Sequence, residues 1–382
     1  MIIIERRLFS KFGHEPVQIK LIKDMINNKF TKIITCKNQD FTIQNNITYP
    51  ILLEYDVKNE GKESSKYIEK NAQVIYSFLN NQNKKIESIF IPSARNLELS
   101  MMVVLLNMIE KSKCPKIFIR ILNDGFFNNL NTKIKEKLIL LLKGGFIFLF
   151  SETEELAKEI EDKYNIACKK LLLPCLIKNA KYIPKKVNDS EFTIGFLGSP
   201  RSNKGVLKIP KIIRIFRKKL SSIETNYKVK FLLQIGNLKK RKKIPFFIVK
   251  YISECFTNKV KIEIIKGNYD NIEFLKTQKR VDIFLLPYSL KSYKFSGSGF
   301  IIDGTMLCKP IIHTSGIAMN EFLNKGNAFG ANTADEFAYA LQKVIFNYKL
   351  FEKKSYECSV FLEQDFKKAK KIINNMWLIV LI

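Results

Sequence analysis

Residues 195–205 read GFLGSPRSNKG, and this stretch decides the fold. It follows an apolar, strand-like run and leads into a helix-like run. A second segment with the same setting, residues 296–304, reads SGSGFIIDG. A strand, a glycine turn and a helix N-terminus together form an anion site, because free backbone N–H groups and the helix dipole point at one spot. Arg201 and Lys204 add two cations to the first turn. The two segments therefore predict a diphosphate held at the edge of a parallel sheet.

The composition predicts a globular protein that is attracted to anions. A length of 382 residues favours two domains, and 46% hydrophobic residues are ample for their cores. Lys and Arg number 65 against 36 Asp and Glu, and this net charge of +29 predicts attraction to polyanions. Nucleic acid, an anionic membrane surface and phosphorylated small substrates all fit that charge.

The cysteines and histidines indicate a protein with reduced thiols and without a histidine-based metal site. The seven cysteines are odd in number and form no C-x-x-C pair, which favours buried thiols in a cytoplasmic protein. His14 and His313 are the two histidines, so a multi-histidine metal site is not available. No signal peptide is visible, and the longest apolar runs fall short of the ~20 residues that span a bilayer. We expect a cytoplasmic protein, either soluble or at the inner face of the cell membrane.

Strand-like and helix-like runs alternate along most of the chain, which predicts an α/β sheet. The strand-like runs are apolar almost throughout, as in parallel strands covered on both faces. Strands are expected at residues 2–4, 86–91, 116–122, 146–150, 192–197, 229–235, 260–265, 282–286 and 310–313. Helices are expected at residues 16–27, 97–109, 133–142, 154–163, 209–220, 271–279, 299–307, 334–346 and 363–376.

Residues 177–190 are polar and aperiodic, and we interpret them as an interdomain linker. The linker separates a predicted first domain, residues 1–176, from a second, residues 191–356. We expect residues 357–382 to form a helix that crosses back to the first domain. The basic run Lys239-Lys240-Arg241-Lys242-Lys243 fits either a solvated surface loop or contact with an anionic membrane.

The second half resembles the nucleotide-sugar domain of GT-B-fold glycosyltransferases, closest to the retaining family called glycosyltransferases group 1, or family 4 type. Three patterns of that family occur in order. Residues 195–205 match G-x-x-G-x-x-R-x-x-K-G, residues 282–288 (DIFLLPY) end a strand in D-I-x-x-x-P, and residues 298–312 resemble S-G-x-x-x-E-A-x-x-x-G-K-P-v-i. The first half matches the family mainly in layout. The resemblance implies an α/β protein of two Rossmann-like doubly wound domains that face a central cleft.

The resemblance implies a role for the cations of the first turn. Arg201 and Lys204 would neutralise the donor diphosphate, and in the transition state the charge on the departing nucleoside diphosphate. Gly198 and Ser199 would line the same turn. No D-x-D pattern occurs in the sequence, which argues against a metal-bridged diphosphate, and the two cations would replace the metal ion.

Further donor contacts are implied after later strands. Ser298 and Gly299 would offer backbone N–H groups to the phosphates, and Asp303 would accept hydrogen bonds from the ribose hydroxyls. Gly267 and Tyr269 lie where the family's nucleobase rests, although an ordinary turn fits them equally well.

The sequence departs from the family at one of the two acidic positions of the third motif. Phe295 stands where most members have a glutamate that orients the donor sugar. A subset of the family lacks this acid too, so the departure affects the expected sugar contacts and not the expected fold.

The first half offers candidates for the acceptor side. Gly13 and His14 lie between the first strand and the first helix, where the family has a glycine loop facing the donor phosphates. Arg120, Asn123 and Asp124 end a strand, and ligands of open α/β sheets gather at such ends. For these residues a turn or a helix start is the alternative interpretation.

The sequence therefore predicts a glycosyltransferase that moves a sugar from a nucleoside-diphosphate sugar to a glycan or lipid-linked acceptor with retention. Cell-envelope polysaccharide, such as lipopolysaccharide or capsule, is the expected product class. No cofactor or metal is expected, and an anionic membrane surface is an expected partner whereas nucleic acid is not. Three alternatives are a GT-B-fold sugar-nucleotide epimerase, a basic nucleic-acid-binding protein and a degenerate, inactive GT-B subunit.

Overall fold

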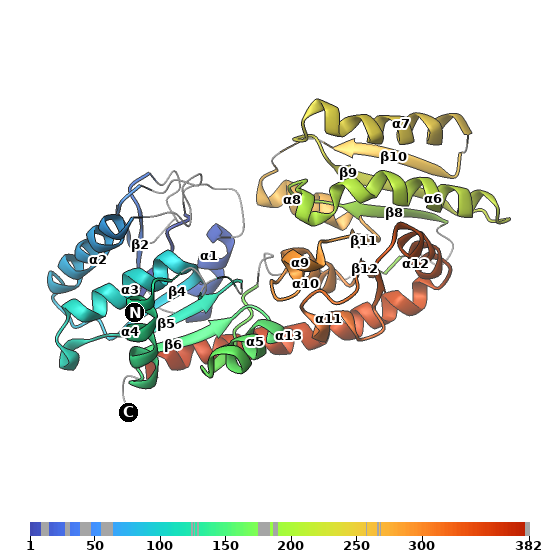
Figure 1. The fold of residues 1–382 in the computed structure, drawn as a ribbon. Helices are drawn as coiled ribbons and strands as arrows, with labels where there is room; N and C mark the ends of the chain where they lie inside the picture. The colour runs from blue at the N-terminus through green and yellow to red at the C-terminus, as the bar shows by residue number, and fades with distance from the viewer. Residues whose placement is uncertain are drawn as a thin grey trace. The chain divides into compact units, whose positions relative to one another are not determined.

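The computed structural model divides the chain into two compact units. The first comprises Met1–Cys175 with Asp365–Ile382, and the second comprises Leu176–Gln364 (Figure 1). The structure describes residues 1–8, 15–26, 31–38, 47–54, 64–123, 125, 127, 130–174, 184–185, 190–256, 258–265, 267 and 269–378. Most of the predicted linker, residues 177–190, lies outside these ranges.

The first unit is built on a parallel sheet with the strand order β3-β2-β1-β4-β5-β6-β7 (Figure 1). Its strands are β1 (Ile2–Ile4), β2 (Lys32–Cys36), β3 (Ile47–Leu52), β4 (Ser88–Ala94), β5 (Lys116–Ile121), β6 (Ile147–Ser151) and β7 (Cys168–Lys170). Its helices are α1 (Glu15–Ile26), α2 (Ser65–Asn80), α3 (Asn96–Met108), α4 (Thr132–Lys143), α5 (Glu154–Tyr164) and the end of α13 (Tyr348–Leu378).

Helices from opposite ends of the chain build one core of this unit. Ile22 of α1 and Ile373 of α13 pack in one cluster with the strand residues Ile3, Phe90 and Phe118, all at most 1% exposed. The strands expose almost no apolar side chain, as expected for parallel strands that are covered by helices. Helix α3 packs against both α2 and α4.

The second unit repeats the same design. Its parallel sheet has the strand order β10-β9-β8-β11-β12-β13. Its strands are β8 (Glu191–Phe196), β9 (Lys228–Gln234), β10 (Val260–Ile265), β11 (Ile283–Leu286), β12 (Ile311–Thr314) and β13 (Ala328–Ala331). Its helices are α6 (Ile209–Ser221), α7 (Lys240–Phe256), α8 (Asn271–Lys279), α9 (Leu290–Tyr293), α10 (Gly299–Met306), α11 (Asn320–Leu323), α12 (Ala334–Phe346) and the first part of α13.

Helix α6 packs on both α7 and α12, and the apolar faces of these three helices share a core with the strands of the second sheet. Helix α12 begins cleanly because the Thr333 side chain accepts the backbone N–H of Glu336, and Asp270 caps α8 in the same way. Helices α8 and α10 belong to a second group, in which Phe274 of α8 contacts Phe300 of α10 edge to face. The alternating elements thus cover the sheet with two separate helix groups.

Both sheets reverse their strand order once. The reversal lies between β1 and β4 in the first unit and between β8 and β11 in the second. In open α/β sheets, ligands bind outside the carboxyl ends of the strands at this switch point. The predicted class, α/β with two Rossmann-like doubly wound parallel sheets, is confirmed.

Two local predictions differ from the structure. One interpretation of the basic run was a solvated surface loop, but Lys240 to Lys243 form the first turn of α7; contact with an anionic membrane stays a prediction. The helix expected at residues 363–376 begins much earlier, at Tyr348. Among the described residues, no helix has the length and apolar character needed to cross a bilayer.

Gly205 is a position in the second unit where an added side chain would clash with the backbone of another loop. Its φ is +71°, and an added Cβ would lie 1.8 Å from the carbonyl oxygen of Pro287. We expect Gly205→Ala to lower the free energy of unfolding by about 3 kcal/mol or more, because backbone strain and a clash with backbone add together. Urea unfolding of the purified variant measures this loss.

Gly326→Ala is the matched control for this change. Gly326 has a φ of +79°, but an added Cβ would meet only the Lys354 side chain at 3.5 Å. Its cost should be limited to the backbone strain of about 1–2 kcal/mol. Equal losses in the two variants would contradict the tight contact between Gly205 and Pro287.

Candidate functional site

The loop that follows β8 forms a tight turn at the switch point of the second sheet. Gly198 and Gly205 both adopt positive φ, +88° and +71°, which side chains other than glycine rarely allow. Between them, Ser202–Lys204 forms one turn of 3₁₀ helix. The Gly205 backbone N–H donates to the carbonyl oxygen of Ser202 at 2.9 Å. The turn therefore has one shape, set by its two glycines.

The two predicted cations of this turn differ in their environment. Arg201 is exposed, whereas Lys204 is buried, with 9% of its surface accessible. The Lys204 Nζ lies 5.0 Å from the centre of the Phe300 ring. The pKa of Lys204 is lowered to about 8, mainly by burial and also by the positive charge of Arg201, against the opposing charge of Asp303. A buried ammonium beside a second cation is an electrostatic site for an anion.

The start of α10 lies against the same turn. Ser298 is the N-cap residue in extended conformation, and Gly299 is the first residue of the helix. The Ser298 hydroxyl donates to the hydroxyl of Tyr288 at 3.4 Å, and its backbone N–H points to the sulfur of Met319 at 3.3 Å. A Cβ on Gly198 would come within 2.6 Å of the Phe300 ring, so the turn and α10 are in close contact.

Asp303 sits one turn into α10 and is buried, with 3% of its surface accessible. It accepts a hydrogen bond of 2.6 Å from the side-chain amide of Gln278 at the end of α8. Its predicted contact with ribose hydroxyls stays a prediction. The structure adds that Gln278 fixes this carboxylate and that its charge acts on Lys204.

Gln234 links the turn to the loop after β10, and sequence reasoning did not single it out. Its side-chain oxygen accepts the backbone N–H of Gly198 at 2.6 Å, and its nitrogen donates to the carbonyl of Gly267 at 2.8 Å. Gly267 has a φ of +84°, and Tyr269 beyond it is half-buried. One signal was present in the sequence: a polar residue that ends an otherwise apolar strand, at the sheet edge where ligands gather.

A third connection joins the loops after β8 and β11. The Ser289 backbone N–H donates to the carbonyl oxygen of Asn203 at 2.8 Å. With the Gly205–Pro287 contact, it holds the turn against the end of β11. The structure thus brings together Gly198, Lys204 and Asp303 with the start of α10, whereas Ser199 is an exposed residue of the same turn.

In the first unit, Arg120 is completely buried and holds three segments together. Its guanidinium donates to the carbonyl oxygens of Leu171 at 3.0 Å and Pro92 at 2.6 Å, and it pairs with the carboxylate of Glu152 at 3.0 Å. These contacts favour a structural role over the predicted substrate contact. The side chain of Asn123 is also engaged locally, because it accepts the backbone N–H of Gly125 at 3.2 Å.

Three predicted residues, Gly13, His14 and Asp124, lie outside the described residues. The predictions for them stay as they were.

The switch point of the first sheet holds a buried charged cluster that sequence reasoning did not predict. Glu5, Arg6 and Arg7 follow β1, and the Arg6 guanidinium pairs with Glu98 of α3 at 2.7 Å. The Arg7 guanidinium donates to the carbonyl oxygen of Ser93 at 2.8 Å. Its backbone N–H donates to the Glu5 carboxylate at 3.1 Å. The sequence does contain a run of charged residues immediately after the first strand. Without the structure, however, this run indicates only where the apolar segment ends.

The two carboxylates of this cluster titrate in opposite directions. Burial raises the pKa of Glu5 to about 7, against the opposing charge of Arg7. Burial also acts on Glu98, but Arg6 and Arg7 together hold its pKa below the ordinary value. Glu5 is therefore a group whose charge changes near neutral pH, at the switch point of the first sheet.

Within the described part of the chain, no three His, Cys, Asp or Glu side chains gather in a way that could hold a metal ion.

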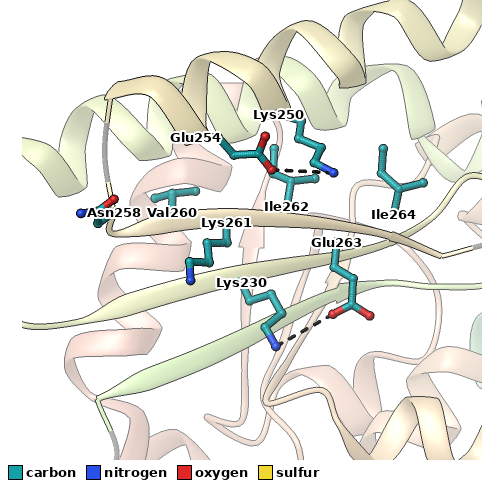
Figure 2. A pocket seen from close by; sticks show the side chains of 9 residues that line it. All are labelled: Lys230, Lys250, Glu254, Asn258, Val260, Lys261, Ile262, Glu263 and Ile264. Atoms are coloured by element: carbon teal, nitrogen blue, oxygen red, sulfur yellow. Dashed lines mark ion pairs between the residues drawn. The ribbon is translucent and has the colours of Figure 1, made fainter.

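A pocket of about 410 Å³ lies apart from these motifs, along the edge strand β10. Figure 2 shows it bounded by β10, by Lys230 of β9 and by α7. Lys230 pairs with Glu263 at 3.9 Å and Lys250 pairs with Glu254 at 3.7 Å, so its charged groups face one another. None of the predicted site residues lines it.

The comparisons with known proteins agree with this architecture. No family model and no curated protein matches the sequence. Solved structures do match over both units. The chain is similar to a glycosyltransferase from Rickettsia africae, with a TM-score of 0.62 and 14% identity over 98% of each chain. It is similar to the E. coli trehalose-6-phosphate protein bound with UDP-2-fluoro glucose, with a TM-score of 0.64 and 12% identity over 98% of each chain.

A third similar structure is Anabaena HepE in complex with UDP and glucose, with a TM-score of 0.63 and 11% identity. The match covers 100% of this chain and 98% of HepE. These neighbours are GT-B glycosyltransferases. The chain has the GT-B fold. In the GT-B fold of this chain, the turn after β8 and the start of α10 occupy the switch point of the second sheet.

Glu5 gives a pH test of the buried cluster. Its folded-state pKa of about 7 is raised from 4.5, so its contribution to stability is fully present below pH 4.5 and is lost as the pH rises through 7. We expect Glu5→Gln, which cannot ionise, to gain stability relative to wild type as the pH rises across that window, by at most about 3 kcal/mol. Chemical unfolding at several pH values measures the difference. A difference independent of pH would show that Glu5 does not titrate in this range.

Proposed function

We propose that the protein is a glycosyltransferase that moves a sugar from a nucleoside-diphosphate sugar to a glycan or lipid-linked acceptor with retention. The observation that carries this proposal is the buried ammonium of Lys204 beside Arg201, at the switch point of the second sheet. The GT-B fold supports it, and two of the similar structures hold UDP or a UDP-sugar analogue.

Lys204 and Arg201 bind the donor diphosphate in this proposal. When the bond between the sugar C1 and the phosphate oxygen breaks, negative charge builds up on the departing nucleoside diphosphate. Fixed cations aimed at that position stabilise the transition state more than the bound donor, which raises the rate. The two cations would do the work of a metal ion, so we propose a metal-independent reaction with no cofactor.

Backbone and side chains around the turn complete the donor site. We assign the phosphates to the start of α10, where the amide of Gly299 lies at the helix N-terminus. The amides of Gly198 and Ser298 already donate to Gln234 and Met319, so these two residues shape the site around the phosphates. Ser199 lines the entrance, and Asp303, fixed by Gln278, accepts from the ribose. The nucleobase lies over Gly267 and Tyr269, a loop that Gln234 ties to the phosphate turn.

We propose retention from the resemblance to the retaining family. The acceptor proton would pass to the departing phosphate, so that no separate base is needed. Phe295 replaces the family's sugar-orienting acid, so the donor sugar is held by other contacts.

The acceptor is assigned to the first unit, where Asp124, Asn123 and His14 stay candidates, whereas Gly13 stays a candidate for close backbone approach to the donor phosphates. Arg120 positions that edge through its buried contacts. A cell-envelope glycan, such as lipopolysaccharide or capsule, is the proposed acceptor class.

Donor binding tests this proposal. We expect UDP-sugars, screened beside GDP-, ADP- and CMP-sugars, to raise the melting temperature of the wild type by several degrees at saturating concentration. The shift should persist in EDTA and should disappear in Arg201→Ala/Lys204→Ala. The variant Lys211→Ala/Lys218→Ala removes two exposed cations from α6 and should keep the shift. No shift with any donor would reject the proposal and favour a degenerate subunit, whereas free nucleotide released without an acceptor would favour an epimerase.

The pKa of Lys204 predicts how donor affinity depends on pH. A diphosphate binds the protonated ammonium, which the free protein loses around pH 8. Affinity for UDP should therefore be full below that value and should fall about tenfold between about pH 7 and pH 9. Isothermal titration at both pH values measures the change. Lys204→Arg keeps its charge throughout this range and should show no such fall; an equal fall in both proteins would place the titrating group elsewhere.

A further inference from the structure

Helix α7 of the second unit carries a stripe of apolar side chains on its outer face. Ile244, Phe247, Ile248 and Tyr251 are each more than half exposed, and Cys255 is exposed as well. Their spacing of three and four residues places them on one arc of the helix, roughly 100° wide. We call these five residues the outer stripe.

The outer stripe is not needed to hold α7 in place. The opposite face of the helix is already docked, with Phe246, Val249 and Ser253 buried against the unit. Figure 1 shows α7 lying along β10 at the edge of the second sheet. A helix that needed only this contact would carry polar residues on its outer face, so the stripe points to a separate contact.

A cluster of cations precedes and opens the same helix. Lys239, Lys240, Arg241 and Lys242 are all exposed, and the first turn of α7 contains no acidic residue. Positive charges at a helix N-terminus oppose the helix dipole and weaken the helix slightly. Their position is therefore not explained by the stability of α7, but it is explained by a negatively charged surface that meets this end of the helix.

We propose that α7 docks the protein on an anionic lipid bilayer. The outer stripe enters the interface between headgroups and acyl chains, and the cations at the helix start bind acidic headgroups. Aliphatic side chains flanked by basic residues suit a bilayer better than nucleic acid, which is bound through aromatic stacking and phosphate contacts. A second copy of the chain would bring two cationic clusters face to face, which is unfavourable.

This surface is separate from the residues proposed to bind the donor. Neither the outer stripe nor the cations include a residue of the turn after β8 or of α10. Lipid binding and donor binding can therefore be measured independently, and the failure of one leaves the other intact.

Co-sedimentation with lipid vesicles tests the proposal. We expect the full chain to bind vesicles of phosphatidylglycerol and phosphatidylcholine mixed one to two, and not vesicles of phosphatidylcholine alone. Binding should weaken steeply with added salt. Phe247→Ser/Ile248→Ser should lower the vesicle partition coefficient at least about tenfold. Arg241→Gln/Lys242→Gln should lower it about thirtyfold. Both variants should keep the thermal shift with the donor.

Matched controls separate docking by α7 from nonspecific hydrophobic binding and from a general effect of net charge. Leu140→Ser/Leu350→Ser removes two exposed leucines from α4 and α13, and Lys218→Gln/Lys353→Gln removes two exposed cations from α6 and α13. Both controls should bind vesicles like the wild type. If they lose binding as strongly as the α7 variants, or if neutral vesicles bind equally well, the proposal is wrong.

An environment-sensitive fluorophore on Cys255 reports the geometry of docking. Cys255 is exposed, whereas Cys36, Cys168, Cys308 and Cys358 are buried. Its emission should shift to the blue with anionic vesicles, and this shift should be absent from Cys255→Ser treated in the same way. An unchanged emission despite vesicle binding would assign the contact to another surface. A dimer in solution that Phe247→Ser/Ile248→Ser converts to a monomer would instead make the stripe a protein interface.

Discussion

The contact between Gly205 and the carbonyl of Pro287 is the constraint on which the second unit's site depends. No side chain fits between them, so the loops after β8 and β11 are pressed together at the point where the strand order reverses. Close packing there buries Lys204 beneath the turn and leaves Arg201 at its surface. A short chain of hydrogen bonds through Gln234 extends the same rigidity to the loop after β10. The geometry of the turn after β8 thus follows from backbone packing.

The charged residues after the first strand of each sheet, β1 and β8, have different surroundings in the two units. In the first unit, the arginines after β1 are engaged by carboxylates and a carbonyl oxygen, and burial leaves Glu5 with a pKa near neutrality. In the second unit, the buried Lys204 faces another cation, with Asp303 as the opposing charge. A site whose cations outnumber its nearby carboxylates attracts a dianion, whereas a balanced cluster orders the sheet edge and offers a titratable group. The GT-B fold supplies the same scaffold twice, and the side chains give each half its own chemistry.

Much of the fold could be predicted from the sequence, because its determinants are local. Apolar runs bounded by turns marked most strands, and the glycines of residues 195–205 predicted the turn after β8. Contacts between distant residues could not be predicted. Nothing in the sequence indicates that Arg6 pairs with Glu98, which lies 92 residues away. The strands β2 and β3 and helix α2 were also not among the predicted elements. The structural role of Arg120 could not be predicted either. Its position at the end of a strand shows that it lies near the sheet edge, but not that other segments bury it completely.

The central claim is that a nucleoside diphosphate binds at the carboxyl ends of β8 and β11, and hydrogen exchange of backbone amides tests it most directly. With UDP added, the account predicts slower exchange in peptides covering residues 195–205 and 296–306, and a smaller effect at residues 267–270. Slowing confined to the first unit, or to the edge pocket along β10, would contradict it, because the diphosphate would then bind where neither the glycine turn nor Lys204 can reach it.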